Sequence, residues 1–267
     1  MPQPIPAQER LNIVLKPVTS ASDVPALASI NERALDSDPL KTWMRLYTER
    51  TEWDTTVQAV TEALTDPNYY VVKAVVLEDD GEAGSGEKEK IVGFVHWMCG
   101  WIVLEKVDPF ATAEKEGGLM GEVKDVKDVL SDVAENLAGK AQKLESVSSS
   151  DREAAERAAR LKRGEAKYVE TRNHYISTIR GKKHMFIRRI MVLPGYQRKG
   201  IARKLMKVVT DEADRQKIVC WLFARPAGER LYESVGYKTI AVTEMDEEEL
   251  KCPPSKAMMR LPQALES

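Results

Sequence analysis

The feature that most constrains the fold is a strand-like run that passes through one short loop directly into an amphipathic helix. Residues 184–193 include a nearly continuous apolar stretch, which is typical of a central, buried strand. Pro194 and Gly195 end this stretch, and residues 200–216 then carry apolar side chains on one helical face. The pattern therefore predicts a strand, a loop and a helix in direct succession.

The loop between this strand and this helix has the composition of an anion-binding site. It reads Pro194-Gly195-Tyr196-Gln197-Arg198-Lys199-Gly200-Ile201-Ala202-Arg203. The N–H groups of a first helical turn lack partners inside the helix and carry partial positive charge, so they can bind a pyrophosphate. Gly200 and Ala202 let the backbone approach phosphate oxygens, and Arg198, Lys199 and Arg203 add positive charge. The alternative is a plain strand-to-helix turn on a basic surface, because the loop has neither the Walker nor the Rossmann pattern.

Periodic apolar residues predict further elements on both sides of this motif. Strands are expected over 11–18, 69–77, 91–99, 218–223, 237–242 and 257–261, and helices after Ser22 or Asp23, over 53–64 and over 226–235.

Residues 103–183 differ in character and are predicted to form a helical insert. An apolar stripe over 123–144 indicates one helix, and Ser150 with Glu153 has the signature of a capping box for a second helix over about 151–168. The favoured interpretation is a helical hairpin docked on the main body. The alternative is a surface that binds a protein partner.

Composition excludes several classes of protein. The 267 residues carry a formal net charge of −2, which gives no argument for nucleic acid or an anionic membrane surface. No apolar run reaches the roughly 18 residues of a membrane span, and the N-terminus lacks the plan of a signal peptide. Three distant cysteines favour a reducing, cytoplasmic location, and the spacing of the three histidines predicts no metal site.

Two sequence signatures in the same order resemble those of the GNAT superfamily of N-acetyltransferases. The first is Gln-x-x-Gly-x-Ala at 197–202, preceded by Ile-Met-Val-Leu-Pro at 190–194, and it is similar to the acetyl-CoA-binding motif of that superfamily. The second is the segment 227–237, which contains Tyr232. The strong resemblance covers about 184–243, and a weaker one in element order extends over 11–101.

The resemblance implies a fold and a cofactor site. The fold would be one α/β domain over 1–267, with a twisted mixed sheet flanked by helices and with the 103–183 insert between the third and fourth strands. The fourth and fifth strands would splay apart, and the pantetheine arm of acetyl-CoA would pair with the backbone of Ile190, Met191 and Val192. The pyrophosphate would sit on the loop, at Gln197, Arg198, Lys199, Gly200, Ile201, Ala202 and Arg203.

The resemblance also implies direct acyl transfer from a thioester to an amine. A backbone donor such as that of Val192 could stabilise the oxyanion, and Tyr232 matches the general acid that protonates the leaving thiolate. Two departures from the family pattern weaken the catalytic expectation. Arg225 stands where some members have an asparagine that contacts the cofactor, and the strand over 219–222 lacks a carboxylate base. A water chain, Glu105 or Glu170 could act as the base, and Tyr232 could instead be a core aromatic residue.

The acceptor is expected opposite the cofactor, by the same resemblance. Trp43, Tyr47 and Trp97 are the predicted substrate-binding residues, near Asp38, Met44 and Trp101. An acidic turn at 244–249 could attract a cationic amine, although a run of like charge is more often solvated surface. The predicted function is N-acetylation of a small-molecule amine. The alternatives are a protein N-acetyltransferase that uses its insert to bind partners, and a CoA-binding module with little catalysis.

Overall fold

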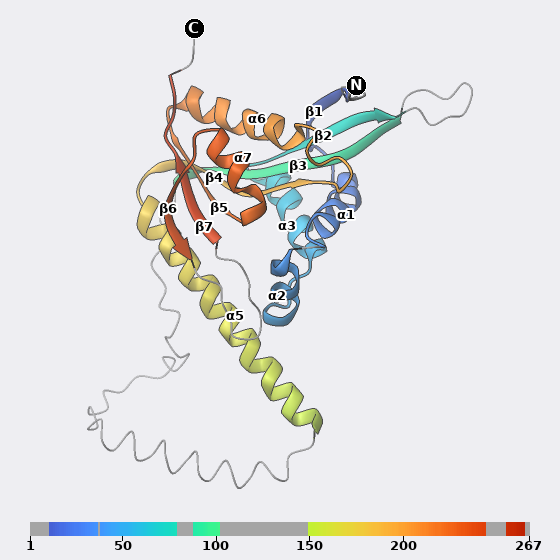
Figure 1. Cartoon of the computed structure of the whole chain (residues 1–267), viewed down its shortest axis with the longest axis vertical. Coiled ribbons are helices and arrows are strands. Elements are labelled where there is room, and N and C mark those ends of the chain that lie inside the picture. The colour runs from blue at the N-terminus through green and yellow to red at the C-terminus, as the bar shows by residue number, and fades with distance from the viewer. Residues whose placement is uncertain (1–10, 37, 79–87, 102–148, 244–254, 265–267) are drawn as a thin grey trace, which may run out of the picture.

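The computed structural model describes residues 11–36, 38–78, 88–101, 149–243 and 255–264 (Figure 1). Within these ranges the chain forms a seven-stranded sheet in the order β1-β2-β3-β4-β5-β7-β6. In chain order, the elements are β1 (Ile13–Pro17), the 3-10 turn η1 (Ala21–Asp23), α1 (Val24–Ala34), α2 (Pro39–Tyr47), α3 (Glu52–Thr65), β2 (Tyr69–Glu78), β3 (Lys88–Trp101), α5 (Ser149–Ile179), β4 (Lys183–Val192), α6 (Ile201–Gln216), β5 (Val219–Ala224), α7 (Pro226–Ser234), β6 (Lys238–Thr243) and β7 (Ser255–Arg260).

Helices cover both faces of this sheet, as the predicted mixed α/β fold requires. β4 and β5 run parallel, and the other neighbouring strands are antiparallel. Alternate side chains along the strands feed two apolar layers. One layer packs under α6 and α7, and the other packs under α1, α3 and the end of α5 (Figure 1). β4 is therefore the central strand of the sheet, and α6 packs on one face of it.

The predicted strands and most predicted helices are confirmed, with ends displaced by a few residues. Helix α2 was not predicted, because Asp38-Pro39 is also typical of the end of a preceding helix. Pro39 is instead the first residue of α2. Proline is well tolerated there because its missing N–H would have no partner in the first helical turn.

The described part of the insert is the single long helix α5. It runs well beyond the predicted 151–168, and Ser150 lies inside the helix, so the predicted capping role of Ser150 is wrong. At its C-terminal end, Tyr175, Ile176 and Ile179 pack against Trp221 and Ala257 of the sheet. The apolar stripe over 123–144 lies outside the described residues, and the helical hairpin stays a prediction.

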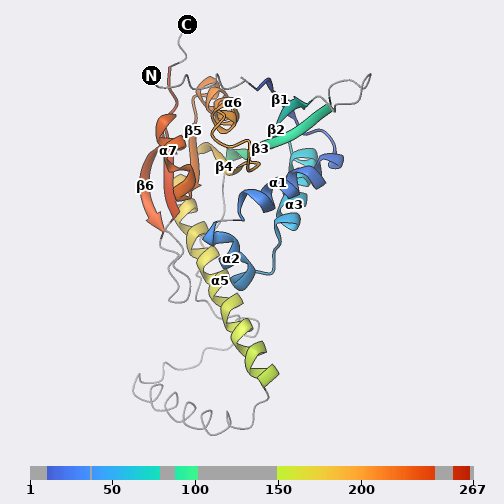
Figure 2. The ribbon, with the colours of Figure 1, turned by 45° about the vertical axis from the view of Figure 1, so that its right-hand side comes forward.

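Helix α2 packs against the middle of α5, as Figure 2 shows. The contact is close at Gly164 of α5, where an added Cβ atom would lie 2.0 Å from the carbonyl oxygen of Tyr47. The guanidinium of Arg163 lies 5.8 Å from the centre of the Tyr47 ring. A glycine inside a long helix is unfavourable by itself, and here it permits the approach of two helices.

Candidate functional site

Strands β4 and β5 pair over a short stretch and then separate. The parallel pairing joins His184–Ile187 to Val219–Leu222, whereas residues 188–192 of β4 keep β3 as their partner. We call the region where 188–192 no longer pairs with β5 the β4–β5 split. The predicted divergence of the fourth and fifth strands is therefore confirmed.

The backbone of β4 faces the β4–β5 split at alternate residues. The Leu193 N–H donates to the Val92 carbonyl over 2.8 Å, and Val192 lies opposite Gly93. This geometry makes Gly93 and Val192 a non-hydrogen-bonded antiparallel pair, so the N–H and C=O of Val192 point away from β3. By the same alternation Ile190 faces the split, while Met191 is bonded to β3. Ile190 and Val192 therefore present backbone polar groups to the split, and Met191, the third residue predicted to pair with the pantetheine arm, does not.

The loop after β4 turns the chain sharply into α6. Gly195, Arg198 and Gly200 have positive φ angles of 87°, 62° and 82°. The first intrahelical bond runs from the Lys204 N–H to the Gly200 carbonyl over 3.1 Å. The N–H groups of Ile201, Ala202 and Arg203 come before that of Lys204, so α6 contains no carbonyl four residues earlier to accept from them. This is the helix start that the sequence predicts for an anion site.

The side chains of the loop divide into anchors and exposed charges. Gln197 Nε2 donates to the Val192 carbonyl over 3.1 Å, which ties the loop to the end of β4. Arg203 donates to Ser234 Oγ of α7 over 3.1 Å. Arg198 and Lys199 are exposed, and the Lys199 ammonium lies 5.2 Å from the centre of the Tyr196 ring. The exposed charges are thus available to an anionic ligand, while Gln197 maintains the shape of the loop.

Tyr232 is buried in α7, in the same apolar cluster as Val192 and Ile201. Its ring packs on the backbone of Gly228, where an added Cβ would come within 2.6 Å of Tyr232 Cε2. Burial raises the pKa of the phenol above its usual value, so the hydroxyl keeps its proton at neutral pH. The Tyr232 ring therefore lies in the apolar core on the face of the sheet that α6 covers.

A buried polar cluster beside the split was not predicted from the sequence. His96 of β3 is 2% exposed, and its Nε2 lies 3.6 Å from a carboxylate oxygen of Glu62 on α3. The same carboxylate accepts a 2.6 Å bond from Arg188. Burial, helped by Arg188 and Arg189, lowers the pKa of His96 to about 3, so His96 is neutral and its contact with Glu62 is no ion pair at pH 7. Only the pairing of β3 with β4 and the packing of α3 create this cluster.

Two of the three predicted acceptor residues, Tyr47 and Trp97, are buried in the structure. Tyr47 is 1% exposed and lies between α2 and α5, while Trp97 is 4% exposed and stacks on Tyr70 with ring centres 5.2 Å apart. Trp43 belongs to α2, and its side chain is outside the described part of the structure. The acceptor role of these three residues stays a prediction.

The structure assigns no general base among the predicted candidates. Glu170 is exposed on α5, and Glu105 and the acidic turn at 244–249 lie outside the described residues. Arg225, which stands where an asparagine was expected, donates to Asp38 over 2.9 Å and to Ser255 over 3.4 Å. Arg225 thus joins three separate segments.

Other features of the described ranges bear on the class of protein. A cavity near α2 is lined by none of the predicted site residues; its lining is Asp36, Lys41, Thr42, Arg45, Arg50 and Glu52. Cys99 and Cys220 are free and buried. Within the described segments there is no group of three His, Cys, Asp or Glu side chains placed to hold a metal ion. Among the helices in these segments, none combines the length and apolar character needed to cross a bilayer.

Comparison with known proteins gives matches to solved structures and to one family model. No curated protein sequence matches the chain. Similar solved structures include arylalkylamine N-acetyltransferase 2 from Aedes aegypti, with 14% identity, a TM-score of 0.49 and coverage of 94% of this chain and 100% of that one. The ribosomal-protein-S18-alanine N-acetyltransferase from Escherichia coli has 14% identity, a TM-score of 0.45 and coverage of 96% and 97%. The PaiA N-acetyltransferase from Thermoplasma acidophilum in complex with coenzyme A has 10% identity, a TM-score of 0.44 and coverage of 94% and 99%.

A family model described as an acetyltransferase (GNAT) domain matches residues 133–254. The match spans β4, the loop, α6, β5 and α7, which include the elements that form the β4–β5 split and the predicted anion-binding helix start. Over residues 133–254, the chain is therefore similar to a GNAT acetyltransferase domain.

Proposed function

We propose that the protein is an N-acetyltransferase that moves the acetyl group of acetyl-CoA to the primary amine of a small molecule. The observation that carries this proposal is the β4–β5 split next to the start of α6. A pantetheine arm can pair with the gap-facing backbone of Ile190 and Val192, as an added strand would. The pyrophosphate then reaches the N–H groups of Ile201, Ala202 and Arg203, with Arg198 and Lys199 supplying charge.

The proposed reaction is direct transfer within a complex of both substrates. The amine nitrogen attacks the thioester carbonyl, and the new C–N bond forms as the C–S bond breaks. The Val192 N–H faces the split and can stabilise the oxyanion. Tyr232 gives its proton to the leaving thiolate, which departs as CoA, and the attacking nitrogen loses its proton to water or to a base.

A thermal shift with acetyl-CoA and thiol release against a panel of amines test this function. Acetyl-CoA should raise the melting temperature, since a ligand that binds only the folded state stabilises it. Tyr232→Phe should lower the rate of thiol release by about 10²-fold or more, because a positioned acid contributes on that order. Tyr237→Phe is the matched control, since Tyr237 is another buried tyrosine with a ring centre 6.0 Å from that of Tyr232.

Three results would separate the alternatives. Equal rates for wild type and Tyr232→Phe would refute the acid role of Tyr232. A thermal shift without thiol release from any amine would favour a CoA-binding module. Equal losses in Tyr232→Phe and Tyr237→Phe would attribute the effect to packing.

A protein N-acetyltransferase is the second candidate, because the N-terminal half of α5 extends past the body of the molecule (Figure 2). Almost all residues of that half are exposed. A folded protein or peptide could bind there while its amine enters the split. Thiol release with peptides of varied N-terminal sequence, compared with the small-amine panel, decides between the two acceptor classes.

A further inference from the structure

Helix α2 carries two predicted acceptor residues and is fixed at both of its ends. At the C-terminal end, Tyr47 packs against Gly164 and Arg163 of α5. At the N-terminal end, the residue before the helix is Asp38, which accepts the 2.9 Å bond from Arg225. The position of α2 therefore depends on contacts to elements far away in the sequence.

The Asp38–Arg225 ion pair is partly buried, with side-chain exposures of 18% and 16%. Arg225 also donates to Ser255 Oγ at the start of β7 over 3.4 Å. A partly buried pair is screened less by salt than an exposed one, and the planar guanidinium fixes direction as well as distance. The pair thus connects the α1–α2 link to the sheet in a defined geometry.

Arg225 directly follows Ala224, the last residue of β5. The last β5 residue that pairs with β4 is Leu222, so Arg225 stands at the open end of the β4–β5 split. The residues proposed to bind acetyl-CoA belong to β4, the loop and α6, whereas the Arg225 guanidinium bonds to Asp38 and Ser255. The pair consequently joins the start of α2 to the end of the strand that borders the split.

We propose that Asp38 and Arg225 are positioning residues that hold α2, as one wall of the acceptor site, at the correct distance from the split. This inference rests on the proposed function, and it assigns no bond-making step to either residue. Two substrates that are bound by different elements react only when those elements are held in the right relative position, and a misplacement of about 1 Å can cost about 10²-fold in rate. Loss of the pair should therefore impair use of the acceptor and leave acetyl-CoA binding intact.

The test is a double-mutant cycle of Asp38→Asn and Arg225→Gln, with KM for the amine, KM for acetyl-CoA and kcat measured separately. Each single variant should lower kcat/KM for the amine by about tenfold or more, because α2 is no longer aligned. The double variant should be no worse than either single variant, since both remove the same contact. KM for acetyl-CoA should stay within about twofold of wild type, and Arg225→Lys should be intermediate because lysine keeps the charge without the planar fork.

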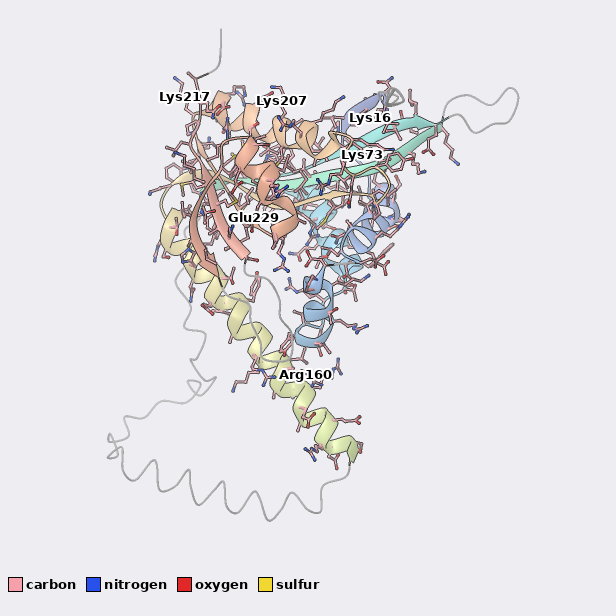
Figure 3. The ribbon with its side chains drawn as sticks, viewed as in Figure 1. Lys16, Lys73, Arg160, Lys207, Lys217 and Glu229 are labelled. Atoms are coloured by element: carbon pink, nitrogen blue, oxygen red, sulfur yellow. The ribbon has the colours of Figure 1, made fainter. Side chains whose placement is uncertain are left out.

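Asp23→Asn is the matched control variant. Asp23 pairs with Lys73 over 2.7 Å at side-chain exposures of 13% and 17%, which closely match those of the Asp38–Arg225 pair. Figure 3 places Lys73 on the β1–β2 side of the molecule, away from Glu229 of α7. Asp23→Asn should lose about as much folding stability as Asp38→Asn and should keep the wild-type kcat/KM for the amine.

The outcomes separate failure of the inference from failure of the proposed function. If the wild type is active, two results would overturn the inference alone. One is an unchanged kcat/KM for the amine in both single variants. The other is a double variant whose loss equals the sum of the two single losses. An equal loss of kcat/KM for the amine in Asp23→Asn would also overturn the inference. A rise in KM for acetyl-CoA that matches the loss of kcat/KM in the Asp38 and Arg225 variants would overturn it as well. A wild type without amine-dependent thiol release would refute the proposed function, and the acceptor role of the pair with it.

Discussion

Gly200 is the residue where the demands of the backbone and of the proposed ligand coincide. Its φ of 82° lies in the left-handed region, and it directly precedes the first residue of α6. An added Cβ would meet no protein atom within 4 Å, so the surrounding protein leaves room there. That open space is where a phosphate would approach the first turn of the helix.

Gly200→Ala should weaken acetyl-CoA binding, and Gly181→Ala should not. Both glycines have positive φ and nothing within 4 Å of an added Cβ, so each change should cost about 1 kcal/mol of folding free energy. Only the methyl group at position 200 would meet the proposed phosphate. The acetyl-CoA-induced rise in melting temperature, measured for both variants, checks this prediction. If both variants lose the acetyl-CoA-induced rise in melting temperature equally, the cause is a general backbone effect and not the proposed phosphate contact.

Two buried histidines should make the protein less stable below neutral pH. Burial lowers the pKa of His96 to about 3 and also lowers the pKa of His184, whose Nε2 accepts from the Tyr175 hydroxyl. Below the unfolded value of about 6.5, the unfolded chain takes up protons that the folded chain refuses. Stability is therefore fully present above about pH 6.5 and is lost as the pH falls, by roughly 1.4 kcal/mol per pH unit for His96 down to its folded pKa of about 3. His184 adds a further loss below about pH 6.5, which ends at its own lowered pKa.

Urea unfolding at pH 7.5, 6.0 and 5.0 measures this dependence. His96→Gln should be less stable at pH 7.5 and should show a shallower fall between pH 6.0 and 5.0, because one of the two linked protons is removed. Identical slopes for the variant and the wild type would contradict the assignment of His96 as a buried neutral group.

At the scale of elements, the contact of α2 with α5 depends on Gly164. In a solvated helix Gly→Ala stabilises by about 1 kcal/mol. Here the new methyl group would lie 2.0 Å from a backbone oxygen of Tyr47, which cannot move aside as a flexible side chain can. Gly164→Ala should thus have the opposite sign and cost about 1–3 kcal/mol, as other overpacked sites do. Chemical unfolding of Gly164→Ala and of Glu165→Ala, a control at an exposed neighbouring position, checks this prediction. A Gly164→Ala variant that is more stable than wild type would contradict it and would show that the two helices separate easily.

The elements differ in how far the sequence alone predicted them. β4 and α6 were predicted to within a residue, because a continuous apolar run and a helical apolar face are local signals. α2 was missed, since Pro39 is compatible both with a break and with a first helical turn. α5 was predicted too short, because its C-terminal part is stabilised by packing of Ile176 and Ile179 on Trp221, which is distant in sequence.

At the scale of the whole molecule, one buried ion pair joins the C-terminal part of the sheet to α6. Arg260 of β7 makes two 2.7 Å bonds to Asp214 of α6, at side-chain exposures of 5% and 10%. Arg260 Nε also donates to the Val235 carbonyl after α7. The pair therefore links β7, α6 and the end of α7.

Asp214→Ala should destabilise the molecule by about 3–5 kcal/mol, because it leaves a buried guanidinium without its carboxylate. Asp211→Ala removes an exposed i,i+4 partner of Lys207 from the same helix and should cost about 0.5 kcal/mol or less. Equilibrium unfolding of both variants checks the prediction. Similar small losses in both would show that the Arg260 charge finds another partner or water.

The local sequence determined the helix start proposed to bind an anion, the glycine at its entry and Tyr232 one helix later, because these depend on residue types a few positions apart. Tertiary structure alone decided that Val192, Ile201 and Tyr232 belong to one apolar core, that His96 lies beside Glu62, and that Asp38 pairs with Arg225. Each of these contacts joins residues that are separated by 30 or more positions. They form only after the sheet has paired and the helices have packed on it, because the register of the strands and the docking of the helices depend on the whole chain.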